Sequence, residues 1–384
     1  MKIAQVSPLI ESVPPRQYGG IERIVSYLTE ELVALDHDVT LFASGDSITS
    51  ARLISPCKRA LRLDVCQESA AYHLVMFEEL YRRAADFDII HFHTDYQHFP
   101  FSRRLTIPHI TTQHGRLDIT ELERLYREFH EIPVVSISDS QREPLPYANW
   151  QGTVYNGLPR DLYRYQSEPD DYLAFLGRIS PEKGLDEAIN IARQTGRRLK
   201  IAAKIDPVDE HYFTKTIQPL LKQPDIEFIG EISDAQKQDF LGNASALLFP
   251  INWPEPFGLV MTEAMACGTP VIAYNRGAVP EVIEHGTSGF IVNTQQEAIN
   301  AVGQLDSINR QHCRRAFEQH FSSQHMTQNY LHLYEQQIRQ HQPDESHNKK
   351  ARPAETNHAI QNLLVTSDDT LTTPAIFPNR INRL

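Results

Sequence analysis

The sequence has few cysteines, and they show no pairing pattern. Only four occur in 384 residues, at positions 57, 66, 267 and 313, and none forms a CxxC motif or a metal-type spacing with histidine. Zinc sites and disulfide frameworks need such spacings, so neither is predicted. Reduced thiols suit a reducing compartment, and we therefore expect the protein in the cytoplasm.

Long apolar runs and an excess of positive charge are also missing. The apolar segment after Lys2 is too short for the core of a signal peptide, and no later run approaches the roughly 18 residues that cross a bilayer. We expect no membrane span, and contact with a membrane surface is left open. The 37 basic residues are outnumbered by 49 acidic ones, for a net charge of −12, which argues against a nucleic acid as partner.

Segments of strand and helix character alternate in two series. The first runs through residues 2–155 and the second through 172–338, and the polar, turn-rich segment 158–171 joins them. Such alternation predicts an α/β fold with parallel, doubly wound sheets. We expect an N-terminal domain at 1–158 and a C-terminal domain at 159–320, each Rossmann-like. Expected elements include a strand at 153–155 and a helix at 212–221, whereas residues 56–66 show no clear period.

The end of the chain changes character twice. Met326, Tyr330, Leu333 and Tyr334 recur at helical spacing, which predicts a final amphipathic helix within residues 321–341. Residues 342–384 are polar, with too few apolar residues for a core, and we expect this tail to be disordered.

The stretch PEPFGLVMTEAMACGTPVIAY, residues 254–274, is the most informative part of the sequence. Pro256 keeps Glu255 in a loop, and helix-favouring residues follow from Gly258 until Gly268. A helix N-terminus exposes unpaired N–H groups, here those of Gly258, Leu259 and Val260, which suit a phosphate. Glu263 follows roughly 7 Å further along the helix, so the two carboxylates bracket the phosphate position.

A second motif, FLGRISPEKG, ends the first strand of the C-terminal domain. Arg178 and Lys183 leave the carboxyl end of that strand, where an open parallel sheet binds its ligands. Gly177 and Gly184 give the backbone room there. Two cations that converge on this edge could neutralise a diphosphate without a metal ion.

Three further sites follow strands of the N-terminal domain. Gly19 and Gly20 lie in the loop after the first strand, where the backbone can approach a ligand closely. His114 ends another strand, in the sequence TTQHG. His91 and His93 alternate on one strand, but no third ligand has suitable spacing, and we predict no metal site.

At these motifs the chain resembles the retaining nucleotide-sugar glycosyltransferases of family four, which have the GT-B fold. The resemblance rests on Glu255 and Glu263 in an EPFG context followed by ACGTPVIA, and on Arg178 and Lys183. It implies two Rossmann-like domains that face one another across a cleft, with the last helix crossing back to the first domain. It also implies transfer of a hexosyl group with retention of configuration and no cofactor or metal ion.

The resemblance implies a role for each matching residue. Arg178 and Lys183 would neutralise the departing nucleoside diphosphate, and Gly19 and Gly20 would face the donor phosphates. Glu255 would hold the donor sugar, Glu263 the ribose and His114 a sugar hydroxyl. For Glu281, in a short helix of the segment 277–292, we expect a structural role.

Other functions remain open from the sequence. A sugar-nucleotide epimerase or a phosphorylase of similar fold would share the phosphate cleft, and a sensor would bind the nucleotide sugar without turnover. A serine hydrolase is not supported, because no GxSxG motif occurs. The nucleotide base, the sugar and the acceptor, whether saccharide, lipid or small molecule, are not defined by the sequence.

Overall fold

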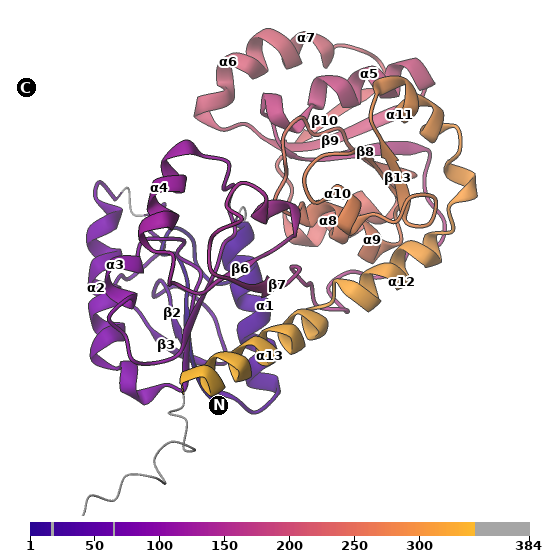
Figure 1. Ribbon diagram of the computed structural model, residues 1–384. Coiled ribbons are helices and arrows are strands. Elements are labelled where there is room, and N and C mark those ends of the chain that lie inside the picture. The colour runs from indigo at the N-terminus through magenta and orange to yellow at the C-terminus, as the bar shows by residue number, and fades with distance from the viewer. Residues whose placement is uncertain (17–18, 64–65, 342–384) are drawn as a thin grey trace, which may run out of the picture. The chain divides into compact units, whose positions relative to one another are not determined.

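The computed structural model describes residues 1–16, 19–63 and 66–341. Two sheets organise them, and every pair of neighbouring strands is parallel (Figure 1). The first sheet has the order β3-β2-β1-β4-β5-β6-β7 and the second β10-β9-β8-β11-β12-β13. In both sheets the direction of winding reverses beside the first strand, at β1/β4 and β8/β11, and ligands of doubly wound sheets bind beyond such points.

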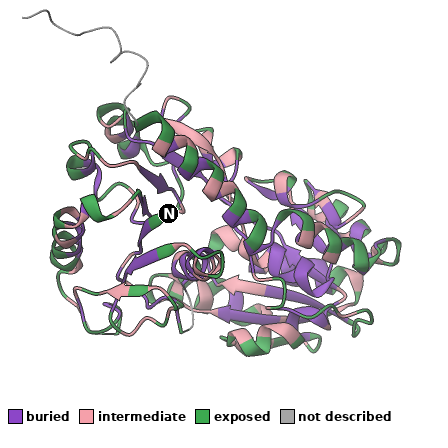
Figure 2. Ribbon diagram, turned by 90° about the horizontal axis from the view of Figure 1, so that it is seen from below, coloured by how far each residue is buried: buried purple, intermediate pink, exposed green. Residues whose placement is uncertain are grey.

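The strands of the first sheet are β1 Lys2–Val6, β2 Asp38–Phe42, β3 Arg52–Ile54, β4 Ile89–Phe92, β5 His109–Thr112, β6 Val134–Ser136 and β7 Trp150–Thr153. Those of the second are β8 Tyr172–Arg178, β9 Arg198–Lys204, β10 Ile226–Gly230, β11 Ala246–Phe249, β12 Val271–Tyr274 and β13 Gly289–Val292. Central strands such as β4 and β11 are buried along their whole length, because helices cover both faces of a parallel sheet (Figure 2).

The helices of the first series are α1 Gly20–Ala34, α2 Ser69–Arg82, α3 Phe99–Ser102 and α4 Thr120–Glu128. The later helices are α5 Leu185–Thr195, α6 Glu210–Tyr212, α7 Gln218–Leu220, α8 Asp234–Gly242, α9 Leu259–Cys267, α10 Val279–Val282, α11 Gln295–Val302, α12 Arg310–His320 and α13 Ser323–His341. Short 3-10 turns include η2 Ser140–Arg142, η3 Pro181–Lys183 and η4 Pro207–Asp209.

The predicted α/β class and doubly wound topology are confirmed, whereas one strand was not predicted and two local predictions were wrong. Strand β3 was missed, because three residues are too few to show a period. The strand expected at 153–155 is β7, which ends at Thr153 and is half-buried along its length, as an edge strand is. The helix expected at 212–221 is divided by a π-helical turn, η5 Phe213–Ile217, just before Pro219, which cannot donate a helical hydrogen bond.

The last helix, α13, packs against the first sheet rather than the second. Met326, Tyr330, Leu333 and Tyr334 are all buried, in a cluster with Ile3 of β1, Ile110 of β5 and other core residues. Figure 1 shows α13 beside α1, and Ser323 Oγ donates to Glu31 Oε1 of that helix at 2.6 Å. The C-terminal helix thus completes the core of the N-terminal sheet.

Both sheets lie in one compact unit, so the boundary proposed at 158/159 stays a prediction. The tail expected to be disordered, 342–384, lies outside the described residues. Within the described part of the chain, no helix combines the length and the apolar character that crossing a bilayer requires.

Candidate functional site

One cavity of about 620 Å³ opens where the carboxyl ends of strands from both sheets meet. Loops after β1, β4 and β5 contribute from the first sheet, and loops after β8 and β11 from the second. Every site residue that the sequence singles out lines this cavity: Gly19, Gly20, His114, Arg178, Lys183, Glu255, Gly258, Leu259, Val260 and Glu263. Residues far apart in the chain therefore share one space.

The N-terminus of α9 forms one wall of the cavity. Gly258 precedes the helix with φ 83°, a left-handed conformation that favours glycine. A Cβ atom at this position would lie 2.8 Å from Met261 Cε and 3.1 Å from Phe249 Cζ, so a side chain would not fit. The first amide groups of α9 have no helical acceptors. Together with the positive end of the helix dipole, they face the cavity.

The glycines after β1 bring α1 against α9. An ideal Cβ on Gly20 would lie 3.7 Å from Leu259 Cδ1, which is ordinary contact across the cavity. On Gly19 it would come within 2.7 Å of Pro15 Cβ, so Gly19 is required by the close turn itself.

Lys183 and Glu255 form an ion pair in the cavity wall. Lys183 Nζ contacts Glu255 Oε2, and Trp253 Nε1 donates to the same oxygen at 3.0 Å. The Lys183 ammonium also lies 5.2 Å from the centre of the Trp253 ring, within range of a cation–π interaction. Glu255 therefore orients the cation next to the α9 N-terminus.

Arg178 is surrounded by carboxylates. It contacts Glu182, and it lies 3.8 Å from Asp206 Oδ2 and 3.5 Å from Asp209 Oδ2. Asp206 precedes the short turn η4, and Asp209 is its last residue. These acidic partners hold the guanidinium at the carboxyl end of β8, where an anionic ligand would compete with them.

Glu263 belongs to a second ionic cluster. Its Oε1 accepts from Lys237 Nζ at 2.7 Å and from Tyr163 OH at 3.3 Å, and its side chain is only 5% exposed. Burial, with the Glu263 charge, raises the pKa of Tyr163 well above its usual range, so the phenol stays a donor. No hydrogen bond from a described residue to Oε2 is seen, and Glu263 lines the cavity.

The same cluster joins the two halves of the protein. Lys237 also lies 3.3 Å from Asp234 Oδ1, and Arg23 of α1 contacts the other oxygen of Asp234. None of these three residues was predicted as a site residue from the sequence. A capping box, in which Ser233 and Gln236 bond each other's backbone, starts α8 and fixes Asp234 and Lys237 on one helical turn. This SDAQK signal was available in the sequence.

His114 faces the cavity from the end of β5. Its Nε2 lies 2.9 Å from Nδ1 of His93, and burial lowers the pKa of His114 to about 3. His91 and His93 are 0% exposed and bond to other side chains of the interior. Among the described residues, no group of three or more His, Cys, Asp or Glu side chains could hold a metal ion.

Acidic residues that the sequence analysis did not single out line the N-terminal side of the cavity. Burial raises the pKa of Glu22 and of Glu11, and Glu11 pairs with Arg62 at 2.9 Å. Burial also raises the pKa of Asp95 to about 6, although a hydrogen bond from the backbone N–H of His114 partly lowers that pKa. They went unnoticed because each is an isolated acid in a loop or a first helical turn.

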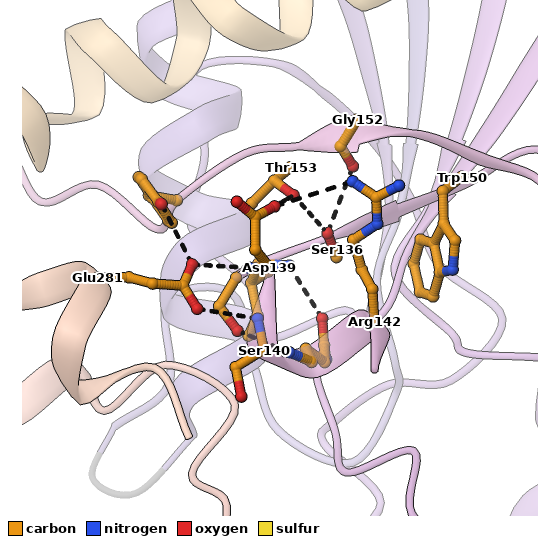
Figure 3. A network of polar contacts seen from close by, with 12 residues as sticks. Ser136, Asp139, Ser140, Arg142, Trp150, Gly152, Thr153 and Glu281 are labelled. Atoms are coloured by element: carbon orange, nitrogen blue, oxygen red, sulfur yellow. Dashed lines mark hydrogen bonds and ion pairs between the residues drawn. The ribbon is translucent and has the colours of Figure 1, made fainter. Parts of the chain in front are cut away.

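Glu281 does not line the cavity. It connects the part of the chain that forms the second sheet with the part that forms the first sheet. Its carboxylate accepts from the backbone N–H of Asp139 at 2.7 Å and of Ser140 at 2.8 Å, and from Tyr155 OH at 3.1 Å (Figure 3). These partners lie at the start of η2 and after β7. The contacts are those of a structural residue, as the sequence led us to expect.

Comparison with known proteins identifies two family regions in the chain. The family described as Glycosyl transferases group 1 matches residues 164–318, and Glycosyltransferase Family 4 matches residues 18–149. An uncharacterised 41.2 kDa protein from the cps region of Klebsiella pneumoniae is 27% identical over 42% of this chain. That match spans 45%, about half, of the relative's own length.

Solved structures show the same fold. AviGT4, a glycosyltransferase involved in avilamycin A biosynthesis, is 24% identical and superposes with a TM-score of 0.66, over 88% of this chain and 98% of its own. HepE from Anabaena, solved with UDP and glucose, is 17% identical with a TM-score of 0.68, over 88% and 100% of the two chains. The chain therefore belongs to the glycosyl transferases group 1, family four, and has the GT-B fold.

Proposed function

We propose that the protein transfers a hexosyl group from a nucleoside-diphosphate sugar to a hydroxylated acceptor, with retention of the anomeric configuration. The observation that carries this proposal is the convergence of Arg178, Lys183 and the α9 N-terminus on one cavity, with Glu255 and Glu263 on either side of it. Positive charge gathers there without a metal cluster among the described residues.

The cations act on the leaving group. As the bond between sugar and diphosphate breaks, negative charge grows on the diphosphate, and Arg178, Lys183 and the amides of residues 258–260 stabilise it. In the free protein both cations contact carboxylates, Lys183 with Glu255 and Arg178 with Glu182. These carboxylates keep both cations oriented before the substrate binds. The donor phosphates then take over part of the contacts. Because protein cations neutralise the diphosphate, we propose that no metal ion or other cofactor is required.

The remaining residues select the donor. Glu255 lies between Lys183 and Trp253 and positions the transferred sugar. Glu263 Oε2 accepts hydrogen bonds from the ribose hydroxyls, and His114 accepts a hydrogen bond from a hydroxyl of the sugar. Glucose carried by UDP is the first donor to test, because HepE was solved with UDP and glucose.

The acceptor attacks from the face on which the leaving group departs, as retention without a side-chain nucleophile requires. It enters along the wall of Glu11, Glu22 and Asp95. No disulfide forms among the described residues, which suits the cytoplasm, and we place the protein there. Contact with a membrane surface stays open, as does the class of the acceptor.

The test combines binding and turnover. A panel of nucleoside diphosphates and their sugars is screened by thermal unfolding, since a ligand raises Tm with the logarithm of its concentration over Kd. The selected donor is then incubated with candidate saccharide, lipid and small-molecule acceptors, and the anomeric configuration of the product is read by NMR. We expect transfer with retention, unchanged by EDTA.

Other outcomes would replace the proposal. Interconversion of the donor sugar without acceptor would indicate an epimerase, and phosphate-dependent cleavage with pyridoxal absorbance would indicate a phosphorylase. Binding without any turnover would indicate a sensor. Loss of transfer in EDTA, restored by magnesium or manganese, would contradict metal independence.

A further inference from the structure

The indole of Trp253 lies beside the ion pair of Lys183 and Glu255, in the loop between β11 and α9. Its Nε1–H donates to Glu255 Oε2 at 3.0 Å, and Lys183 Nζ contacts the same oxygen. An indole N–H can only donate and an ionised carboxylate can only accept, so the two groups themselves fix the direction of this bond. Trp253 is therefore a donor to a carboxylate that lines the cavity.

The main chain brings the two side chains together. Trp253 and Glu255 each precede a proline, which disfavours the helical conformation for both residues. The Glu255 N–H donates to the carbonyl oxygen of Trp253 at 2.9 Å, which closes a three-residue turn around Pro254. The sequence WPEP thus builds a short, stiff loop in which the indole reaches the carboxylate two residues further on.

The loop after β12 also holds the backbone of Glu255. The Ala278 N–H donates to the carbonyl oxygen of Glu255 at 2.9 Å. Gly277 has a φ of 53° and packs so closely that a Cβ atom there would collide with that oxygen. Because these contacts hold the main chain, the orientation of the Glu255 side chain depends on its own partners.

The two contacts on Oε2 respond differently to a donor substrate. Lys183 is a cation in the cavity wall, and an incoming diphosphate competes with Glu255 for it. Trp253 does not itself line the cavity, and its indole carries no net charge to attract a phosphate. When Lys183 turns towards the diphosphate, the indole N–H therefore remains as the partner that keeps Oε2 in place.

The Trp253 ring has a second cation nearby, from the first half of the chain. Lys183 Nζ lies 5.2 Å and Arg116 Cζ 5.5 Å from the ring centre, and both are within range of a cation–π interaction. Arg116 follows β5, and its guanidinium donates to the Asp118 carboxylate at 2.7 and 2.8 Å. The ring thus keeps a partner when Lys183 moves.

We propose that Trp253 is a positioning residue for the donor sugar. Its N–H fixes Oε2 of Glu255 and so directs the other carboxylate oxygen, Oε1, towards a hydroxyl of that sugar. The hydrogen bond between Trp253 and Glu255 concerns the free protein, whereas the contact with the sugar rests on the proposed function. Trp253 touches neither the sugar nor the diphosphate and acts through Glu255.

The chain offers a matched control for the test variant. Trp253→Phe removes the N–H and keeps an aromatic ring beside the two cations. Trp150 is the other tryptophan of the chain. Its Nε1 donates to the carbonyl oxygen of Leu145 at 2.8 Å, and Arg142 Cζ lies 5.5 Å from its ring centre. Trp150→Phe therefore removes the same kind of bond in β7, outside the cavity lining.

The first measurement separates positioning from general damage. Binding of UDP-glucose and of UDP is measured by calorimetry, with the best-binding pair of the donor panel in their place where another base is preferred. Trp253→Phe should weaken the nucleotide sugar about tenfold, because a hydrogen bond to a charged group is lost, and leave the nucleoside diphosphate unchanged. Trp150→Phe should change neither affinity. Equal weakening of both ligands in Trp253→Phe, or none, overturns the proposal.

A double variant shows whether Trp253 acts through Glu255. Glu255→Ala removes the acceptor of the indole N–H, so adding Trp253→Phe to it should weaken the nucleotide sugar no further, relative to the nucleoside diphosphate. Affinity is compared because it can be measured where turnover is lost. A second tenfold loss in the double variant would mean that Trp253 acts by another route, and the proposal would be wrong.

The hydrogen bond itself is observed without any sugar. Protein labelled with ¹⁵N in the indole rings is measured by NMR, and Trp150→Phe identifies the N–H resonance of Trp253. Glu255→Ala should move this resonance, whereas saturating UDP should leave it near its wild-type position, because the bond survives when Lys183 turns towards the diphosphate. A resonance that does not respond to Glu255→Ala, or that UDP moves to the position seen in Glu255→Ala, overturns the proposal.

The two proposals fail in different ways. If the wild type neither binds nor turns over any nucleotide sugar, the proposed function is wrong, whatever the indole resonance shows. If the wild type transfers sugar and Trp253→Phe weakens the nucleotide sugar no more than the nucleoside diphosphate, only the role of Trp253 is wrong.

Discussion

Removing Lys237 tests how far the ionic cluster around Glu263 stabilises the protein. The Lys237 and Glu263 side chains are 16% and 5% exposed and lie 2.7 Å apart. Lys237→Met therefore leaves a buried carboxylate whose one hydrogen-bond partner among the described residues is the Tyr163 hydroxyl. Breaking one side of a buried ion pair costs about 3 kcal/mol or more. At about 2 °C per kcal/mol for a large chain, Tm should fall by about 6 °C.

Two further variants make this measurement specific. Arg82→Met breaks an ion pair with Glu78 whose side chains are 70% and 65% exposed, and such a pair is worth less than about 1 kcal/mol. The double variant Lys237→Met/Glu263→Gln removes both charges and should recover most of the lost Tm, since the new amide oxygen can still accept from Tyr163. Equal Tm values for Lys237→Met and Arg82→Met would refute the role of burial, and a double variant no better than Lys237→Met would refute the pairing.

Two other predictions concern Asp95 and Glu281. The pKa of Asp95 is raised from 3.8 to about 6, so its ionised form opposes folding above that pH. Asp95→Asn should therefore raise Tm at pH 7.5, and the difference in Tm from the wild type should shrink as the pH falls from 6 towards 4. A difference in Tm that does not change with pH would contradict this. Glu281→Ala should cost about 2 kcal/mol, seen as a lower Tm, because two backbone N–H groups lose a charged acceptor. Its affinity for nucleoside diphosphate, measured by calorimetry, should not change, because Glu281 does not line the cavity.

The fold could be predicted because its signals are local. Each long helix shows its own apolar period and each central strand a short apolar run, and the alternation of the two indicates a parallel topology. Strand β3 and the interruption before Pro219 were missed, since three residues carry no period and a single proline does not reveal which turn it widens.

The candidate site could be predicted only in part. Glycines, the two strand-end cations and the paired glutamates stand in compact motifs, and the structure brings all of them to one cavity. Residues that contact the site from another helix or strand could not be predicted from such motifs. Lys237 reaches Glu263 from α8, Glu281 reaches Ser140 across the two halves, and Tyr334 reaches Gln5 over 329 positions of sequence. Such contacts depend on how the elements pack, which periodicity and motif spacing do not specify.

The chemistry of His114 shows the same limit. Its place after β5 follows from the sequence, but its protonation state follows from burial next to His93. A strand-end histidine next to a carboxylate would behave as an acid or base, whereas this one is held neutral.

The most direct test of the account compares the cations with Glu263 in steady-state kinetics, with the donor varied at saturating acceptor. If Arg178 and Lys183 stabilise charge that grows on the departing diphosphate, Arg178→Ala and Lys183→Ala should each lower kcat about a hundredfold, or roughly 3 kcal/mol, with a smaller change in nucleotide affinity. Glu255→Gln should resemble them, and Glu263→Gln should mainly raise KM for the donor, because a ribose contact is the same in ground and transition states. Wild-type kcat in both Arg178→Ala and Lys183→Ala would contradict the proposed mechanism.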